Sequence, residues 1–289
     1  HFISSYAGDV TNFCIYLKRL SPSASVKFFS AIGEDPLSQK MGAFLLQEAI
    51  DTQLIFVSPD KTIGLYIVHT DDLGERTFSY WRSDSAAKRM FSIADTEQLH
   101  QVTQSIDYFY FSGITLAILN QQNREKLLAF VSSLRKKGKT IIFDPNFRTK
   151  LWQNIEEARA QIAQAYSLTN ILLSSCDDEQ MLFGRYSLDN TLEHLQSFNI
   201  DEIILTNGPN EIVGIYQGNR INVTPEKAKQ VVDTTSAGDA FNAGYIAARH
   251  AGIKPKIAIK HASMLASQVI GFRGAIIPKG VALHTPGIV

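Results

Sequence analysis

The chain has 289 residues, enough to bury a sizeable core, and a single α/β domain of this size is common. Lysine plus arginine and aspartate plus glutamate both total 28, so the net charge is zero and neither a nucleic-acid nor a membrane partner is expected. The apolar runs are short, no signal peptide opens the chain, and Cys14 and Cys176 lack the spacing of a disulfide framework or zinc site. We therefore expect one soluble, cytoplasmic domain over residues 1–289.

The first part of the chain predicts two helices, at residues 12–20 and 36–48, on either side of a strand at 26–31. Two β-rich runs within residues 62–82 flank a polar turn, which is typical of an antiparallel hairpin and suggests a lid. The chain opens at His1 in mid-pattern, so we expect that a strand preceding the first helix is absent.

From residue 108 onward the sequence predicts strands in alternation with helices. The expected strands are 108–112, 140–144, 171–174 and 203–206, and the expected helices include 124–137 and 155–166. The strands at 171–174 and 203–206 are almost continuously aliphatic, as a parallel sheet covered on both faces requires. The predicted fold class is therefore α/β, with three layers.

Residues 231–249 read as a strand end, a tight turn and a helix. Thr235 or Ser236 is placed to cap this helix, and the backbone N–H groups of Ala237, Gly238 and Asp239 have no earlier turn to bond. Free donors at the positive end of a helix make an anion hole suited to a transferring phosphoryl group. A carboxylate in a first helical turn also has a purely structural reading, because it complements the helix dipole.

The string from Asp233 to Phe241 resembles the D-T-T-x-A-G-D-x-F signature of the ribokinase-like, phosphofructokinase-B type family of sugar kinases. The resemblance implies a ribokinase-like fold, ATP and Mg²⁺ as cofactors, and Asp239 as the base that deprotonates a primary alcohol. Ser236 stands where most of the family carries glycine, which resembles the 2-keto-3-deoxygluconate kinase branch. Asp233 opens the motif, and we give it a supporting, metal-linked role.

The stretch from Phe143 to Trp152 follows a buried strand and resembles the family's D-x-N-x-R-x-x-L-W motif. This implies that Asn146 lies near the phosphates and that Arg148 reaches the substrate. The planar, permanently charged guanidinium of Arg148 suits a carboxylate, which a neutral hexose would not supply. A surface arginine at a strand end is the alternative.

The hairpin string from Gly74 to Arg82 is similar to that of 2-keto-3-deoxygluconate kinases, which implies Tyr66, Tyr80 and Arg82 as lid residues on the substrate. On an alternating strand, residues 80 and 82 share one face. We also expect a homo-oligomer formed through the lid, because a hairpin face carrying Phe78 and Trp81 would otherwise be an exposed apolar edge.

Residues 7–12 correspond to the family's G-G-D-x-x-N element, with alanine in place of the first glycine. The resemblance places Gly8, Asp9 and Asn12 beside the sugar hydroxyls.

The resemblance also implies a nucleotide site, with residues from three segments: Thr206, Asn207, Gly208, His261 and Gly274. The family's Mg²⁺-associated N-x-x-E pattern appears with Asp177 for asparagine and Gln180 for glutamate. Oxygen ligands suit Mg²⁺, and the candidates are Asp177, Asp178, Glu179 and Asp233.

A sugar acid and ATP are thus the expected small-molecule partners. A fructokinase or ribokinase would share the anion hole but not the pair of Arg82 and Arg148. No G-x-G-x-x-G follows a strand, which argues against an NAD-dependent oxidoreductase, and an intact Asp239 argues against a catalytically silent sugar sensor.

Overall fold

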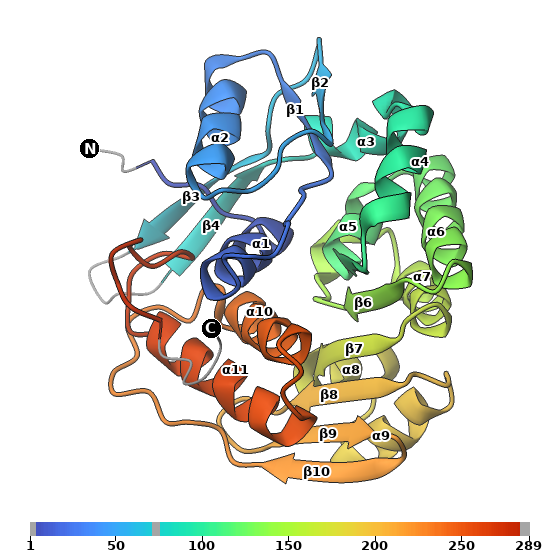
Figure 1. Cartoon of the computed structure of the whole chain (residues 1–289), viewed down its shortest axis with the longest axis vertical. Helices are drawn as coiled ribbons and strands as arrows, with labels where there is room; N and C mark the ends of the chain where they lie inside the picture. Colours follow the sequence, from blue (N-terminus) through green and yellow to red (C-terminus); the bar gives the residue numbers. More distant parts are fainter. Residues whose placement is uncertain (1–3, 71–75, 284–289) are drawn as a thin grey trace. The chain divides into compact units, whose positions relative to one another are not determined.

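A computed structural model of the chain describes residues 4–70 and 76–283 (Figure 1). The chain divides into two compact units, each described by itself below. Unit 1 comprises His1–Ala24, Ile106–Ala117 and Leu128–Val289, and unit 2 comprises Ser25–Ser105 and Ile118–Leu127. No helix of the described part has the length and apolar character needed to cross a bilayer.

Unit 1 is built on a six-stranded sheet with the order β10-β9-β8-β7-β6-β5. Its strands are β5 (Tyr108–Ser112), β6 (Thr140–Asp144), β7 (Ile171–Ser175), β8 (Glu202–Thr206), β9 (Ile212–Tyr216) and β10 (Asn219–Val223). Strands β5 to β8 are parallel, whereas β9 and β10 extend the sheet antiparallel at one edge. The four predicted strands are confirmed, and Ile203, Ile204 and Leu205 are almost fully buried, as a sheet covered on both faces requires.

Helices pack on this sheet (Figure 1). They are α1 (Asp9–Leu20), α5 (Gly113–Ile118), α6 (Gln121–Lys136), α7 (Ile155–Ser167), α8 (Cys176–Phe183), α9 (Leu188–Gln196), α10 (Ala237–His250) and α11 (Pro255–Val269). Helix α10 lies between α1 and α11, and α8 packs on β7. The predicted helices at 12–20, 124–137 and 155–166 are confirmed, with ends that differ by up to three residues.

The connection after β5 requires a glycine. A Cβ atom on Gly113 would lie 1.9 Å from the carbonyl oxygen of Pro145, which follows β6. Only glycine therefore lets the carboxyl ends of β5 and β6 approach each other this closely. This close approach brings Ser112 and Asp144 to one edge of the sheet.

Unit 2 contains a parallel pair of strands, β1 (Ser30–Gly33) and β2 (Ile55–Ser58), with α2 (Pro36–Gln47), α3 (Met90–Ile93) and α4 (Thr96–Ser105). Asp35 begins α2 by accepting hydrogen bonds from the N–H groups of Leu37 and Ser38. The strand predicted at 26–31 starts late, because Lys27 makes only an isolated bridge with Asp51 and the ladder begins at Ser30.

The predicted hairpin is confirmed as β3 (Leu65–Thr70) and β4 (Arg76–Trp81), paired antiparallel with Tyr66 opposite Tyr80. The turn at 71–75, including Gly74, and the Phe78 side chain lie outside the described residues. The prediction that one face of the hairpin carries both positions 78 and 81 is wrong, because positions an odd number of residues apart fall on opposite faces of a strand.

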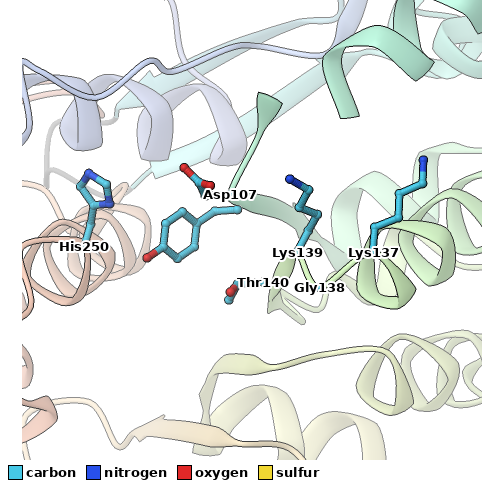
Figure 2. A pocket seen from close by; sticks show the side chains of 7 residues that line it. Asp107, Lys137, Gly138, Lys139, Thr140 and His250 are labelled. Atoms are coloured by element: carbon cyan, nitrogen blue, oxygen red, sulfur yellow. The ribbon is translucent and has the colours of Figure 1, made fainter. Parts of the chain in front are cut away.

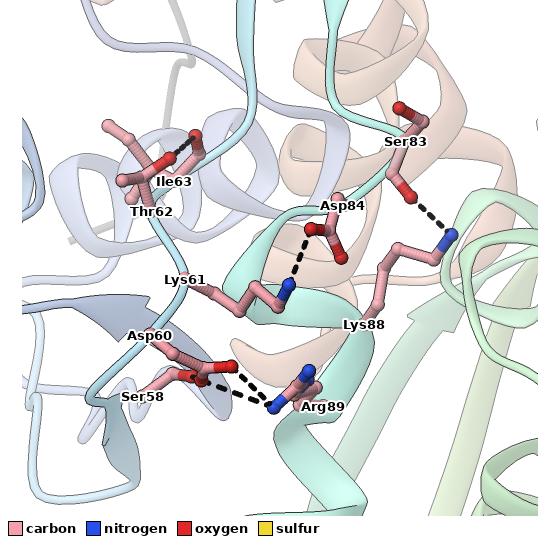
Figure 3. A network of polar contacts seen from close by, with 9 residues as sticks. All are labelled: Ser58, Asp60, Lys61, Thr62, Ile63, Ser83, Asp84, Lys88 and Arg89. Carbon is pink, nitrogen blue, oxygen red and sulfur yellow. Dashed lines mark hydrogen bonds and ion pairs between the residues drawn. The ribbon is translucent and has the colours of Figure 1, made fainter.

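Ion pairs tie together the two segments that lead into the hairpin (Figure 3). Lys61 Nζ lies 2.5 Å from Asp84 Oδ2, and Arg89 Nη1 lies 3.1 Å from Asp60 Oδ2. Exposed pairs of this kind contribute little to stability. They join the segment before β3 to the segment after β4.

Candidate active site

The turn before α10 has an unusual backbone. Ser236 occupies the N-cap position in a left-handed conformation, with φ of 68°, and its side chain makes no capping hydrogen bond. The expectation that Thr235 or Ser236 caps the helix through its side chain is therefore wrong for Ser236. Glycine adopts this conformation at no cost, which gives a physical reason for glycine at this position in relatives.

Two of the three predicted backbone donors are free in the described part of the chain. The N–H of Ala237 donates to the carbonyl of Thr234 at 3.2 Å, so it does not point into the anion hole as predicted. The N–H groups of Gly238 and Asp239 have no such bond among the described residues. With the dipole of α10 they form a site for negative charge.

Asp233 holds this turn in place. One carboxylate oxygen accepts from the N–H of Thr235 at 2.9 Å, and the other accepts from the N–H of Gly274 at 2.6 Å. Asp233 thus joins the turn to the left-handed Gly274, with φ of 86°, and both of its oxygens are engaged by backbone. This arrangement suits the supporting role predicted for Asp233 better than the metal-linked one.

Asp239 is buried in the first turn of α10 and accepts a 2.8 Å hydrogen bond from the side-chain amide of Asn12. Burial, with a further contribution from the negative charge of Asp9, raises the pKa of Asp239 to about 7. Asn12, the neighbouring Ser236 hydroxyl and the charge of Arg148 oppose this rise. A carboxylate whose pKa lies near neutrality is suited to general base catalysis.

The start of α1 positions the predicted sugar-binding residues. The carbonyl of Gly8 accepts from the N–H of Asn12 at 2.7 Å, and the side chain of Asn12 faces the N–H of Gly8 at 3.4 Å. Asp9 accepts a 2.5 Å hydrogen bond from the hydroxyl of Ser112 at the end of β5, and desolvation raises its pKa. Gly8, Asp9 and Asn12 therefore lie together with Asp239.

The end of β6 contributes a residue that the sequence reasoning missed. Asp144 is buried, and burial together with the charges of Asp178, Asp239 and Asp9 raises its pKa well above the usual value. One of its oxygens accepts from the backbone N–H of Asn146 at 3.0 Å. Asn146 is buried and left-handed, with φ of 35°.

A signal for Asp144 was present, because this residue opens the D-x-N-x-R motif. Ser112, Tyr110 and Asn242 were also missed. Among these, Asn242 follows Asp239 by three residues and so lies one helical turn further on.

Arg148 is exposed, and its guanidinium donates to the carbonyl of Phe147 at 2.8 Å. Burial raises the pKa values of Asp9, Asp178 and Asp239, and the positive charge of Arg148 opposes each of these rises. An exposed guanidinium beside the buried acids can receive a second, external anion.

The predicted metal candidates differ in their surroundings. Asp177 and Gln180 are exposed, whereas Asp178 and Glu179 are buried. Glu179 is fully buried and accepts from Tyr166 at 2.5 Å and from Ser174 at 2.8 Å, and burial raises its pKa to about 7. Asp178 accepts from the N–H of Phe147 at 3.0 Å.

The residues predicted for the nucleotide lie on separate segments of unit 1. Thr206 ends β8 and donates to the carbonyl of Ser174 at 3.2 Å, and it is followed by Asn207 and the left-handed Gly208. His261 lies on α11 with its Nδ1 atom buried and without a hydrogen-bond partner among the described residues. Burial lowers the pKa of His261, which favours the neutral ring.

The three lid residues form a group of their own in unit 2. The rings of Tyr66 and Tyr80 lie 6.1 Å apart, and the guanidinium of Arg82 lies 4.3 Å from the centre of the Tyr80 ring. This cation–π contact confirms that Tyr80 and Arg82 share a face of the hairpin.

A cavity of about 390 Å³ lies at the amino-terminal ends of β5 and β6 (Figure 2). Lys137, Lys139, His250 and Asp107 are among its lining residues. The predicted site residues lie instead at the carboxyl ends of the parallel strands, where ligands of such sheets bind.

Comparison with known proteins agrees with this geometry. Residues 1–280 match the family described as pfkB family carbohydrate kinase. The chain belongs to the pfkB family of carbohydrate kinases. Among relatives of this kinase, the 2-dehydro-3-deoxygluconokinase of Dickeya dadantii is 38% identical over 278 residues, which are 94% of this chain and 90% of the relative.

A second relative of the kinase, the 2-dehydro-3-deoxygluconokinase of Escherichia coli K12, is 36% identical over 279 residues, covering 95% of this chain and 90% of the relative. The crystal structure of 2-dehydro-3-deoxygluconokinase from Thermotoga maritima superposes with a TM-score of 0.81 at 20% identity, covering 96% of this chain and 88% of that one. Fructokinase from Vibrio cholerae, with fructose, ADP and calcium bound, has a TM-score of 0.81 at 26% identity, covering 95% of this chain and 88% of that one. The predicted ribokinase-like α/β fold is confirmed.

Proposed function

We propose that this kinase transfers the γ-phosphate of ATP to the primary hydroxyl of 2-keto-3-deoxygluconate (2-dehydro-3-deoxygluconate), giving the 6-phosphate. The observation that carries the proposal is the buried Asp239 at the head of α10, with its pKa raised to about 7 and its carboxylate held by Asn12. The names of two relatives at 38% and 36% identity support the choice of substrate.

In this reaction Asp239 accepts the proton of the sugar hydroxyl while the hydroxyl oxygen attacks the γ-phosphorus of ATP. The bond between that phosphorus and the oxygen bridging to the β-phosphate breaks, and ADP leaves. The free N–H groups of Gly238 and Asp239, at the positive end of α10, face the negative charge that builds up on the transferring group. Because these donors are backbone atoms, they stay in place whether residue 236 is serine or glycine.

The substrate's carboxylate binds Arg148, with Gly8, Asp9 and Asn12 beside the sugar hydroxyls. Tyr66, Tyr80 and Arg82 contribute from the hairpin when it closes over the sugar. The stacking of Arg82 on Tyr80 supports this role, because it keeps the guanidinium on one face of the hairpin. Hairpin closure would also exclude water, which competes as a phosphoryl acceptor.

ATP binds with its phosphates near Asn146 and the head of α10, and with its base near Thr206, Asn207, Gly208, His261 and Gly274. The unpartnered, buried Nδ1 of His261 supports a polar contact there. A neutral ring, which the lowered pKa favours, can accept or donate one hydrogen bond to an adenine edge.

Mg²⁺ would accompany the nucleotide and neutralise charge on its phosphates. No cluster of three or more acidic, histidine or cysteine side chains in the described part forms a ready-made metal site. Mg²⁺ bound with a nucleotide needs only one or two carboxylates, since waters and phosphates complete its shell. Asp178 fits best of the four candidates, because it is buried near Asp144 and its charge helps to raise the pKa of that second carboxyl group.

We propose that the chain forms a homo-oligomer through the hairpin. Leu65 and Trp81 face each other across the strands and are 42% and 58% exposed, which leaves an apolar patch on one side of the hairpin. Light scattering tests this proposal, since Trp81→Glu should convert an oligomer to a monomer. A wild-type protein that is monomeric at micromolar concentration would contradict it.

A fructokinase is the second candidate function, because the Vibrio alginolyticus fructokinase is 28% identical over 249 residues. A coupled ADP-release assay across 2-keto-3-deoxygluconate, its galactonate epimer, fructose and ribose separates the two. We expect the highest kcat/KM for 2-keto-3-deoxygluconate. A higher value for fructose or ribose would favour the second candidate.

A further inference from the structure

One oxygen of Asp144 collects two side-chain hydrogen bonds from different elements of unit 1. Tyr110, in β5, donates its hydroxyl to Asp144 Oδ2 at 3.2 Å, and Asn242, in α10, donates its amide to the same atom at 2.9 Å. The other oxygen accepts from the backbone of Asn146. Asp144 therefore joins β5, β6 and α10 at one point.

This junction is one helical turn from the proposed base along α10, and the charge of Asp239 helps to raise the pKa of Asp144 after the larger effect of burial. Asn242 is three residues after Asp239 in α10, so the two side chains leave the helix on neighbouring positions. The ring of Tyr110 stacks on Phe13 with 3.7 Å between centroids and 2° between planes, and Phe13 follows Asn12 in α1. Asn12 in turn donates to Asp239.

These contacts close a ring of elements around Asp239. It runs from α10 through Asn242 and Asp144 to Tyr110, then through Phe13 to Asn12 and back to Asp239. Asn12 holds the Asp239 carboxylate directly, and Asn242 ties the helix that carries Asp239 to β6 through Asp144. A carboxylate placed by a fixed helix stays at the distance that proton transfer needs, without reorganising during the reaction.

We propose that Asn242 and Tyr110 are positioning residues, which hold Asp144 against α10 and thereby fix the Asp239 carboxylate for proton transfer. This inference rests on the proposed role of Asp239 as the base. Asn242 is only 6% exposed on a helix whose inward positions are otherwise mostly alanine, glycine and large apolar residues. A buried amide is costly unless it is hydrogen-bonded, and here its amide group bonds the carboxylate of Asp144.

The test compares Tyr110→Phe, Asn242→Ala and the double variant in steady-state kinetics. Tyr110→Phe removes only the hydroxyl and keeps the ring stacked on Phe13, so it should fold even if Asn242→Ala does not. We expect kcat to fall about tenfold to a hundredfold in each single variant, the loss that a misplaced catalytic group typically brings. The KM values for ATP and for the sugar should stay within about twofold of wild type.

The double variant should lose no more than about the stronger single variant, because both donors act through the same oxygen of Asp144. Tyr245→Phe is the matched control. It removes a buried tyrosine hydroxyl from the same helix, three residues after Asn242. This hydroxyl donates to the carboxylate of Glu202 and not to that of Asp144. Its kcat should equal that of wild type even where its melting temperature falls.

Asp239→Asn is assayed in parallel. If Asp239→Asn is inactive while Tyr110→Phe and Asn242→Ala keep the wild-type kcat, the positioning role is wrong and the proposed base stands. If Asp239→Asn is active, the proposed base fails and the inference fails with it. The positioning role would also be wrong if excess Mg²⁺ restored the kcat of the single variants. It would be wrong as well if the fold-losses in kcat of the two single variants multiplied in the double variant.

Discussion

Asn12 donates a 2.8 Å hydrogen bond to Asp239, although 227 residues separate them in the chain. The contact joins the first helix of the chain to the helix that carries the proposed base. Because an amide N–H favours the ionised carboxylate, it opposes the rise in pKa that burial and Asp9 impose on Asp239. The base is thereby kept near neutrality, where it can both accept and release a proton.

Replacing Asp239 by asparagine should lower kcat about 10²- to 10⁴-fold, because the amide keeps the shape of the side chain but cannot accept the hydroxyl proton. Isothermal titration should show nucleotide affinity within a few-fold of wild type. Asp189→Asn is the control, since that side chain is 80% exposed and pairs with Arg220 on the surface. Equal rates for Asp239→Asn and wild type would remove Asp239 from the mechanism.

The activity should depend on pH through Asp239. The base must be ionised, and its pKa is about 7, so kcat/KM should fall as the pH drops through this value. In Asn12→Ala the ionised form loses a hydrogen bond, and the acid limb of the profile should move to higher pH. Asn123→Ala, which removes a buried asparagine that bonds Ser92 in unit 2, should leave the limb in place. A limb that moves to lower pH in Asn12→Ala would contradict this reading of the contact.

Exchanging Ser236 for glycine should increase the free energy of unfolding, by about 0.5–1 kcal/mol, because Ser236 is left-handed and glycine adopts that conformation without a steric penalty. Turnover should persist, since the donors of the anion hole are backbone N–H groups. Ser187→Gly makes the same exchange at the N-cap of α9, where the side chain accepts from Asn190 and the backbone is extended. That variant should lose a few tenths of a kcal/mol. Chemical denaturation measures both, and a destabilised Ser236→Gly would indicate a contact of the hydroxyl.

Removing either Arg82 or Arg148 should raise the KM for 2-keto-3-deoxygluconate by one to two orders of magnitude, roughly the loss expected for a charge-assisted pair. The KM for ATP should barely change. The effect of Arg82 should be the smaller one, because part of its contact energy is used in ordering the lid. Fructose, which lacks the carboxylate, should be poor with wild type, and both variants should discriminate less against it. Arg220→Ala serves as the control on an exposed arginine.

The sequence predicted the four parallel strands of unit 1 and the position at which α10 begins, because both follow from local patterns. Short runs of aromatic or aliphatic residues place β5 to β8, and the small residues before Asp239 place the turn. The antiparallel edge formed by β9 and β10 was missed, since short polar-flanked strands carry little signal of their own. The late start of β1 was also missed, because ladder pairing depends on a partner strand more than twenty residues away.

Within the site, local motifs predicted the residues but not their partners. Asn12 was expected beside the sugar, and its bond to Asp239 depends on how α1 packs against α10. The left-handed backbone of Ser236 could not be read from the sequence either, because serine normally avoids this conformation. The hydrogen bond from the N–H of Ala237 to the carbonyl of Thr234 also depends on the conformation of that turn.

Several buried acids at one edge of the sheet have a consequence for the ligand-free protein. In the unfolded chain an aspartate titrates near 3.9, whereas Asp239 in the fold titrates at about 7, and the pKa of Asp144 is raised too. Between these values the native state holds more protons than the unfolded state, so the free energy of unfolding falls as the pH rises from about 4 towards 7. Without ligand, the protein should therefore have its highest melting temperature in mildly acidic solution, where Asp239 is protonated and cannot act as a base. At the pH at which Asp239 is ionised and the enzyme is active, the melting temperature should be lower.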